Sequence, residues 1–316
     1  MVEPMSLSDK TRTALNDSRT LMLGAQILLG FQIRAPFQDG FDVLHQTEKS
    51  LEVVVLMLMV VVVGLLIAPT ARHRIVERGE ARVEFNHFVS HVAFVTLFPF
   101  AFAVGLNLFI AGTVFANSRW IAFASGIGGC LVALALWYGP LMIKRNNPKS
   151  PSADRLEKTP PAKKIEFVLT EARVVLPGAQ ALLGFQLSIV LTRAFAELPS
   201  SLKLLHGLSL LFVALATLLL VAPAAFHRIV YDGSDDPNFY RTASRFVVAG
   251  TAFLAAGLSV ETYVVVAKIT GNSIISQALA WSAAVILFGI WHVWPALIRV
   301  TSAAPGSTGK LGGGSQ

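Results

Sequence analysis

The stretch GAQILLGFQ at residues 24–32 occurs again, with one substitution, as GAQALLGFQ at residues 178–186. The two copies are 154 positions apart, and the same separation relates Pro69 to Pro223 and the motif HRIV at residues 73–76 to HRIV at residues 227–230. A constant separation of this kind indicates that one unit has been duplicated and fused. The sequence therefore predicts two similar units in one chain.

The composition is typical of an integral membrane protein. Hydrophobic residues make up 54% of the 316 residues and charged residues only 14%, about half the charged fraction of a soluble domain. Eight apolar runs, four in each unit, each approach the roughly 20 residues that cross a bilayer as a helix. They lie at residues 20–37, 50–68, 89–115, 120–143, 174–192, 204–224, 246–268 and 274–298.

These runs predict an all-α polytopic protein with eight transmembrane helices. Helices are expected because backbone groups in lipid must form hydrogen bonds within their own segment. Four crossings return the chain to the side where it began, so we expect two parallel four-helix repeats about a pseudo-twofold axis along the membrane normal. The predicted order is an N-terminal segment (1–19), repeat 1 (20–143), a basic linker (144–169), repeat 2 (170–299) and a flexible tail (300–316).

The distribution of positive charge predicts the orientation. Of 26 Lys and Arg residues, all but Arg34, Lys49, Arg119, Arg193, Lys203 and Lys268 fall on the side that carries the N-terminus, the linker and the C-terminus. Cytoplasmic loops carry such an excess, so both termini are expected in the cytoplasm. Because the net charge of +7 follows this pattern, we do not expect nucleic acid as a partner.

The second apolar run of each unit ends in a motif that carries a family resemblance. Together with the Gly-Phe-Gln helix, the motif Ala-Pro-x-Ala-x-His-Arg-Ile-Val resembles an uncharacterised bacterial family of four-helix integral membrane proteins of unknown function. The resemblance covers residues 16–143 and 170–298, and implies a tandem duplication in the bacterial inner membrane. Members are often labelled sodium:proton antiporters by automatic transfer, but the motif itself contains no residue set specific to that activity.

One buried carboxylate is the main candidate for ion transport. Glu261 is the acidic residue that stands well inside an apolar run, and the 154-residue offset aligns it with Asn107. Both are expected at the depth of Gln32 and Gln186, in the outer half of the membrane. Polar groups at membrane depth are either functional or packed against other helices. The alternatives are a protonated Glu261 that is hydrogen-bonded to a Gln, or a Glu261 that snorkels outward near Lys268.

The first helix of each unit adds a second pair of amides. Gln26 lies four residues before Gly30, and Gln180 and Gly184 repeat that spacing. A small residue beside a polar one predicts close helix packing with a hydrogen bond across the contact. Gln26 and Gln180 are thus candidates either for a packing contact or for ligands at the interface between the repeats.

The cations near the helix ends are candidates for binding lipid headgroups or terminal carbonyls. They are His73, Arg74, His227, Arg228, Arg241 and Arg245. His87 and His91 are four residues apart and form a weak candidate for a metal site, but the second unit has Arg241 and Arg245 at those positions. His45 and His206 are not related by the offset and are expected to have no special role.

Two functions remain open on these observations. The first is a transporter of protons or monovalent cations, with Glu261 as the titrating group. The second is a non-catalytic scaffold that binds anionic lipid or a partner complex. No motif of a known enzyme class is present, so we expect no enzymatic activity and no cofactor. A homo-oligomer, or a pseudo-dimer within one chain, is the expected assembly.

Overall fold

The structure is a computed structural model that describes residues 7–116, 118–143, 159–231 and 236–302. Its helices are α1 (Leu7–Arg34), η1 (Ala35–Phe37), η2 (Asp39–Phe41), α2 (Gln46–Ile75), α3 (Val83–Ala116), α4 (Arg119–Ile143), α5 (Pro161–Val190), α6 (Arg193–Ala196), α7 (Ser200–Ile229), α8 (Pro237–Thr270), α9 (Ser273–Phe288), the π-helical segment η3 (Gly289–Val293) and α10 (Trp294–Ser302). Three parts of the predicted organisation lie outside the described residues. They are residues 1–6 of the predicted N-terminal segment, residues 144–158 of the predicted linker and residues 303–316 of the predicted tail. The all-α prediction is confirmed for the described part of the chain.

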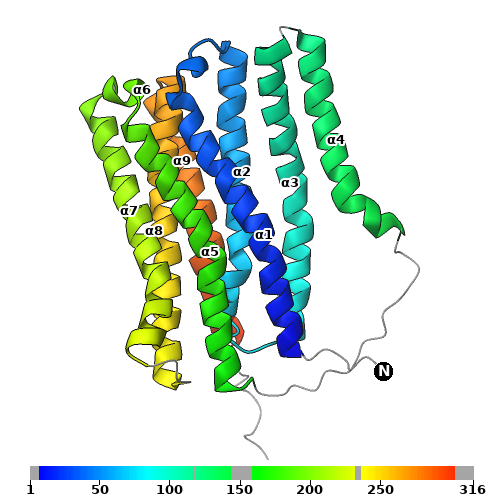
Figure 1. Ribbon diagram of the computed structural model, residues 1–316, viewed down its shortest axis with the longest axis vertical. Helices are drawn as coiled ribbons and strands as arrows, with labels where there is room; N and C mark the ends of the chain where they lie inside the picture. Colours follow the sequence, from blue (N-terminus) through cyan, green and yellow to red (C-terminus); the bar gives the residue numbers. More distant parts are fainter. Residues whose placement is uncertain (1–6, 117, 144–158, 232–235, 303–316) are drawn as a thin grey trace, which may run out of the picture.

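Within the described residues, seven helices are long and apolar enough to cross a membrane. They are α2, α3, α4, α5, α7, α8 and the continuous α9–η3–α10. Helix α1 has 28 residues but is too polar to be counted with them, although it runs alongside the others (Figure 1). The eighth crossing and the exact twofold arrangement therefore stay predictions.

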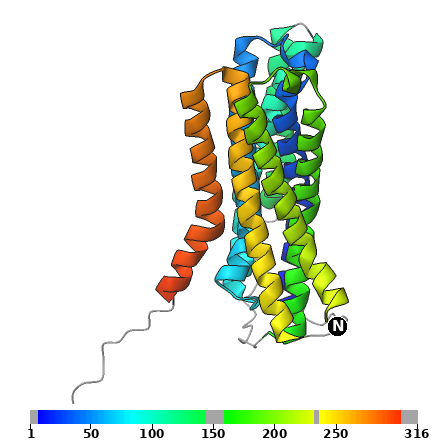
Figure 2. The ribbon, with the colours of Figure 1, turned by 90° about the vertical axis from the view of Figure 1, so that its left-hand side faces the viewer.

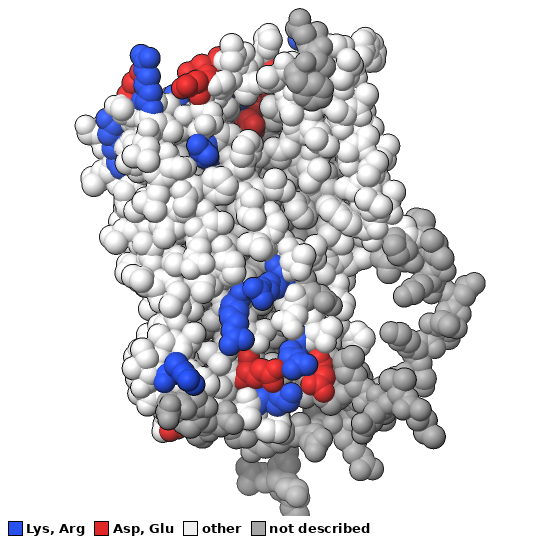
Figure 3. All heavy atoms as spheres, viewed as in Figure 1, with Lys and Arg blue, Asp and Glu red and all other residues white. Residues whose placement is uncertain are grey.

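The helices form one bundle with two distinct ends (Figure 1). We call the end with the connections after α1, α3, α5 and α8 the upper end, and the end with the connection between α2 and α3 the lower end. On the face drawn in Figure 3, a band without charged side chains separates charges near the upper edge from charges in the lower part. Such a band is the surface expected where hydrocarbon covers a protein.

Local sequence explains the tight connection between α8 and α9. Gly271 ends α8 with a φ of 63°, which glycine adopts without the strain that a Cβ would cause. Asn272 then caps α9, because its Oδ1 accepts hydrogen bonds from the backbone N–H groups of Ile274 and Ile275. The two helices therefore run antiparallel side by side.

Helix α2 is the most buried of the helices that are long and apolar enough to cross a membrane. In its most apolar stretch 67% of the residues are buried, against 33% in the corresponding helix α7 of the second unit. It contacts α1 and α3 of its own unit and also α8, α9 and η3 of the other unit. Trp291 in η3 donates a 2.7 Å hydrogen bond from Nε1 to the backbone oxygen of Gly64 in α2. Figure 2 shows α9 and α10 running down the outer side of the bundle. The two units thus differ in their surroundings.

Helices α1 and α5 cross closely at two glycines. A Cβ on Gly30 would lie 2.2 Å from the Phe185 ring, and a Cβ on Gly178 would lie 1.5 Å from Gln26 Oε1. Only a residue without a side chain allows these contacts. The repeated GAQ–GFQ stretches therefore meet each other at the interface between the two units.

Candidate functional site

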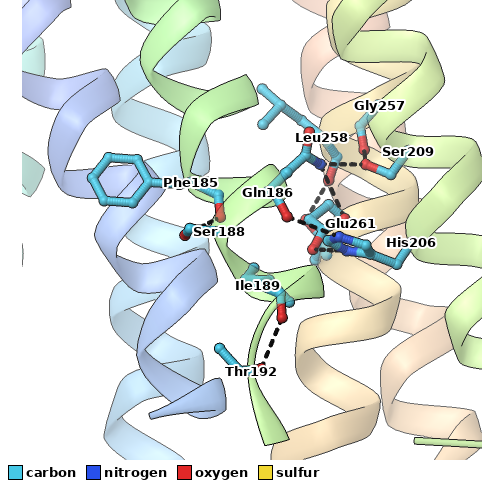
Figure 4. A network of polar contacts seen from close by, with 11 residues as sticks. Phe185, Gln186, Ser188, Ile189, Thr192, His206, Ser209, Gly257, Leu258 and Glu261 are labelled. Carbon is cyan, nitrogen blue, oxygen red and sulfur yellow. Dashed lines mark hydrogen bonds and ion pairs between the residues drawn. The ribbon is translucent and has the colours of Figure 1, made fainter. Parts of the chain in front are cut away.

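A buried polar cluster joins α5, α7 and α8 near the upper end (Figure 4). Gln186 lies on α5, His206 and Ser209 on α7, and Glu261 on α8, and none of the four is more than 1% exposed. His206 Nδ1 lies 3.0 Å from Glu261 Oε1, and His206 Nε2 lies 3.2 Å from the backbone oxygen of Gln186. Gln186 Nε2 donates to Glu261 Oε2 at 3.0 Å and to Ser209 Oγ at 2.7 Å.

The hydrogen-bond pattern fixes how many protons the pair His206–Glu261 holds. The backbone oxygen opposite Nε2 can only accept, so Nε2 carries a proton. One further proton must lie between Nδ1 and Glu261 Oε1, because two lone pairs would otherwise face each other at 3.0 Å. That proton sits either on an imidazolium beside a carboxylate or on a carboxylic acid beside a neutral imidazole. In both forms the pair has no net charge, which lowers the cost of burying it.

Packing around the cluster holds its members in place. Ser209 Oγ donates to the backbone oxygen of Gly257 at 2.8 Å, which leaves its lone pairs free to accept from Gln186. A Cβ on Gly257 would lie 2.7 Å from a Val213 methyl group, so this glycine permits the close approach of α7 and α8. The ring of Phe195 covers His206 at 5.1 Å between centroids. Bound in this way, the carboxylate of Glu261 has no exposed surface.

The first unit contains a related but different arrangement. Gln32 Nε2 donates to Asn107 Oδ1 at 2.6 Å, across the same 75 residues that separate Gln186 from Glu261. Asn107 Nδ2 donates to the backbone oxygen of Ala103 at 2.9 Å, which fixes the orientation of the amide. The offset aligns His206 with Glu52, whose side chain is 6% exposed and whose Oε2 has no hydrogen-bond partner.

A second buried cluster joins the two units at the lower end. Glu171 on α5 accepts hydrogen bonds from Arg74 on α2 through Nε and, at 2.8 Å, through NH2. His73 Nδ1 also contacts Glu171 Oε1, and Arg74 NH1 lies 3.2 Å from Ser244 Oγ on α8. The side chains of Glu171 and His73 are 0% exposed and that of Arg74 is 1% exposed. An ion pair without access to water therefore binds α2 of the first unit to α5 of the second.

A further ion pair at this end involves Glu80, which lies in the connection between α2 and α3, outside the membrane-crossing segments. Glu80 contacts Lys164 Nζ and accepts a 3.0 Å hydrogen bond from the backbone N–H of Thr159. Partial burial acts to raise the pKa of Glu80, but the hydrogen bonds from Lys164 and Thr159 and the Lys164 charge outweigh it, so that the pKa lies below its ordinary value of 4.5. Thr159 Oγ1 in turn accepts from the backbone N–H of Ala81 at 3.0 Å. These contacts fix the start of the second unit to the connection between α2 and α3.

The family of the chain follows from a comparison with family models. The model described as a family of unknown function, DUF6328, matches residues 8–140 and again residues 159–295. The chain belongs to the DUF6328 family. The two matches confirm the predicted duplication. Comparisons with curated proteins and with solved structures gave no match.

The transport candidates fall into four environments in this DUF6328 protein. Gln186 and Glu261 meet in one cluster, and Gln32 and Asn107 meet in another, each pair through one hydrogen bond. Gln26 is fully buried against Gly178, and neither of its amide atoms has a hydrogen-bond partner. Gln180, its counterpart by offset, is exposed.

The basic candidates also differ among themselves. His73 and Arg74 are buried against Glu171, so the prediction that they bind lipid headgroups is wrong for these two. His227 packs its ring 4.8 Å from that of Phe239, and its Nε2 has no hydrogen-bond partner. Arg228, Arg241 and Arg245, at the lower end of the second unit, are exposed.

The weak metal candidates do not form a cluster. His87 and His91 are both exposed on α3. Within the described residues, no group of three His, Cys, Asp or Glu side chains is placed to hold a metal ion. These positions can therefore offer an ion at most two imidazoles.

Three ionisable residues of the buried clusters were missed by the sequence analysis. His206 was expected to have no special role, and Glu52 and Glu171 were passed over because they stand near polar segments. The repeat offset held a signal for each. It aligns His206 with Glu52, and Glu171 with Asp17, so an ionisable residue recurs at both positions of the DUF6328 unit.

Proposed function

We propose that this chain is an eight-helix membrane transporter that moves protons, alone or with a monovalent cation, through the pair His206–Glu261, and that it is not an enzyme. The observation that carries the proposal is the 3.0 Å contact between His206 Nδ1 and Glu261 Oε1, buried inside a bundle whose helices are long enough to cross a membrane. Ionisable residues within such segments are costly and typically mark ion or proton pathways. Both termini are proposed to lie in the cytoplasm, following the positive-inside pattern.

The geometry suggests how a proton would be taken up and released. Glu261 is fully buried, so water can reach it only when α5 moves relative to α7 and α8. Such a movement would break the hydrogen bonds from Gln186 and leave the carboxylate and imidazole free to exchange their proton. Closing the contact would restore the neutral, buried pair. Transporters alternate access to a buried site by movements of this kind.

Proton flux into liposomes tests the proposal. The purified full-length protein is reconstituted with a pH-sensitive dye inside, and flux is driven by a pH gradient or by a potential, with and without Na⁺ or K⁺. Glu261→Gln and His206→Gln are each expected to reduce the flux to the rate of empty liposomes. Glu197→Gln is the matched control, because Glu197 is an exposed carboxylate at the same end, paired with Arg193 at 2.9 Å.

Flux that is unchanged in both variants would exclude the pair as the proton pathway. If the intact protein also moves neither protons nor cations, the transport proposal fails. The second candidate would then be a scaffold that binds anionic lipid, favoured by exposed cations at the lower end such as Arg228, Arg241 and Arg245. Retention on vesicles would not distinguish the two candidates, so flux is the deciding measurement.

A further inference from the structure

The first unit contains buried oxygen atoms without a donor to bind. Glu52 Oε2 and Gln32 Oε1 are both buried and have no hydrogen-bond partner, and Gln32 is 1% exposed. Within the described residues, Glu52 takes part in no ion pair. A carboxylate buried without a partner costs several kcal/mol or more. Something positive is therefore required beside it.

The repeat offset relates the surroundings of these oxygen atoms to the cluster of the second unit. Helices α1, α2 and α3 contact one another as α5, α7 and α8 do. The bond from Gln32 to Asn107 matches the bond from Gln186 to Glu261 in its helices and its spacing. Glu52 has the α2 position that corresponds to His206 on α7, and His206 contacts both members of its bonded pair. By this correspondence we infer that Glu52 faces Gln32 and Asn107.

The chemistry of the two sites differs in one respect. In the second unit, His206 supplies an N–H donor from Nε2 to the backbone oxygen of Gln186. In the first unit, Glu52 supplies only acceptors, the free oxygen of Gln32 adds another, and Asn107 Oδ1 keeps a lone pair beyond the one that Gln32 Nε2 uses. Carboxylate and amide oxygens are the ligands that bind small, hard cations. A proton on the carboxylate would satisfy the same set by donating to Gln32 Oε1.

We propose that Glu52, Gln32 and Asn107 form a binding site for one small monovalent cation, either a proton or an alkali ion held by the same oxygen atoms. The site uses other residues than the pair His206–Glu261 and does not depend on its function. Other ionisable groups that its neighbouring elements carry at this end are Arg34, Asp39, Asp42, His45, Glu48, Lys49, Arg119, Glu261 and Lys268. Of these, Glu48 and Glu261 are also buried.

Infrared difference spectroscopy on the purified full-length protein tests this site directly. The C=O band of a protonated carboxyl group is recorded at neutral pH in choline chloride, and again after exchange into NaCl, KCl or LiCl. We expect one protonated carboxyl band that is absent in Glu52→Gln and present in Glu261→Gln and in the exposed control Glu197→Gln. Loss of the band on adding an alkali salt identifies that ion as the ligand, and an unchanged band identifies the proton.

A second variant keeps the test decisive if Glu52→Gln does not fold. Gln32→Met removes the acceptor opposite Glu52 and keeps the carboxyl group, so the band should shift to the position of a non-hydrogen-bonded acid. The inference is overturned if no band depends on Glu52 or Gln32 and no alkali salt changes the spectrum. Because this readout is binding and not flux, its failure is distinguishable from failure of the proposed transport.

Discussion

Replacing Glu171 by Gln tests whether the buried cluster at the lower end binds the two units together. The substitution keeps the shape of the side chain but removes its charge, which leaves Arg74 buried without a counterion. Breaking a buried pair by neutralising one partner destabilises by about 3–5 kcal/mol. For a chain of this length each kcal/mol corresponds to about 2 °C in melting temperature, so we expect a decrease of roughly 6–10 °C.

The matched control lies on the same helix. Glu166 on α5 pairs with Arg12 at 3.0 Å and with Lys163 at 3.3 Å, but its side chain is 36% exposed. An exposed pair contributes about 0–1 kcal/mol, so Glu166→Gln should lower the melting temperature by about 2 °C or less. Both variants are heated in detergent, and unfolding is followed by the fluorescence of the tryptophans.

A double variant separates the loss of the pair from the burial of a lone charge. Adding Arg74→Met to Glu171→Gln removes both charges, and the combined loss should be smaller than the sum of the two single losses. If Glu171→Gln melts within about 1 °C of the Glu166→Gln control, the buried pair adds nothing and the argument from burial is refuted.

Two further predictions concern packing and acid stability. Gly30→Ala should destabilise the protein by about 1–3 kcal/mol, because the added Cβ would lie 2.2 Å from the Phe185 ring. Gly184→Ala is the control and should be neutral or stabilising, because nothing lies within 4 Å of its added Cβ. Equal melting temperatures of the two variants would contradict the close crossing of α1 and α5. The pKa of Glu80 is lower in the folded protein than its ordinary value of 4.5. Glu80 therefore stabilises the fold at a pH above its unfolded-state pKa, and this stabilisation is lost as the pH falls below about 4.5 and through the folded-state pKa. The melting temperature should therefore fall less steeply with acid in Glu80→Gln than in the intact protein, and parallel curves would show that Lys164 contributes nothing through this carboxylate.

Sequence patterns were sufficient to predict the features that follow from apolar runs and from the repeat. Seven of the eight apolar runs lie in helices that are long and apolar enough to cross a membrane. Glu261 and Asn107, which the offset relates, each form a hydrogen bond with the glutamine whose depth they were predicted to share. The helices extend beyond those runs, as in α1, which begins at Leu7 and not near residue 20. Hydropathy marks only the segment suited to lipid, while the helix continues through polar residues that hydrogen-bond along the same axis.

The ionic contacts could not be obtained in the same way. His206 stands near the start of an apolar run, where a polar residue ordinarily marks the end of a helix, and its partner Glu261 follows 55 residues later. Glu171 and Arg74 belong to different units, 97 residues apart. Pairs of this kind depend on how helices rotate against each other, and a single sequence contains no measure of that rotation.

The differences between the two units support an argument about why they are joined in one chain. Each unit has one carboxylate beside the glutamine that ends its repeated stretch, but the carboxylate lies on α8 in the second unit and, by register, on α2 in the first. In the second unit a histidine contacts the carboxylate, and in the first the proposed neighbours are amides. A homodimer of identical units would hold two equal sites. A fused pair can hold two sites of different proton affinity in one chain, so that each site can be occupied over a different range of pH.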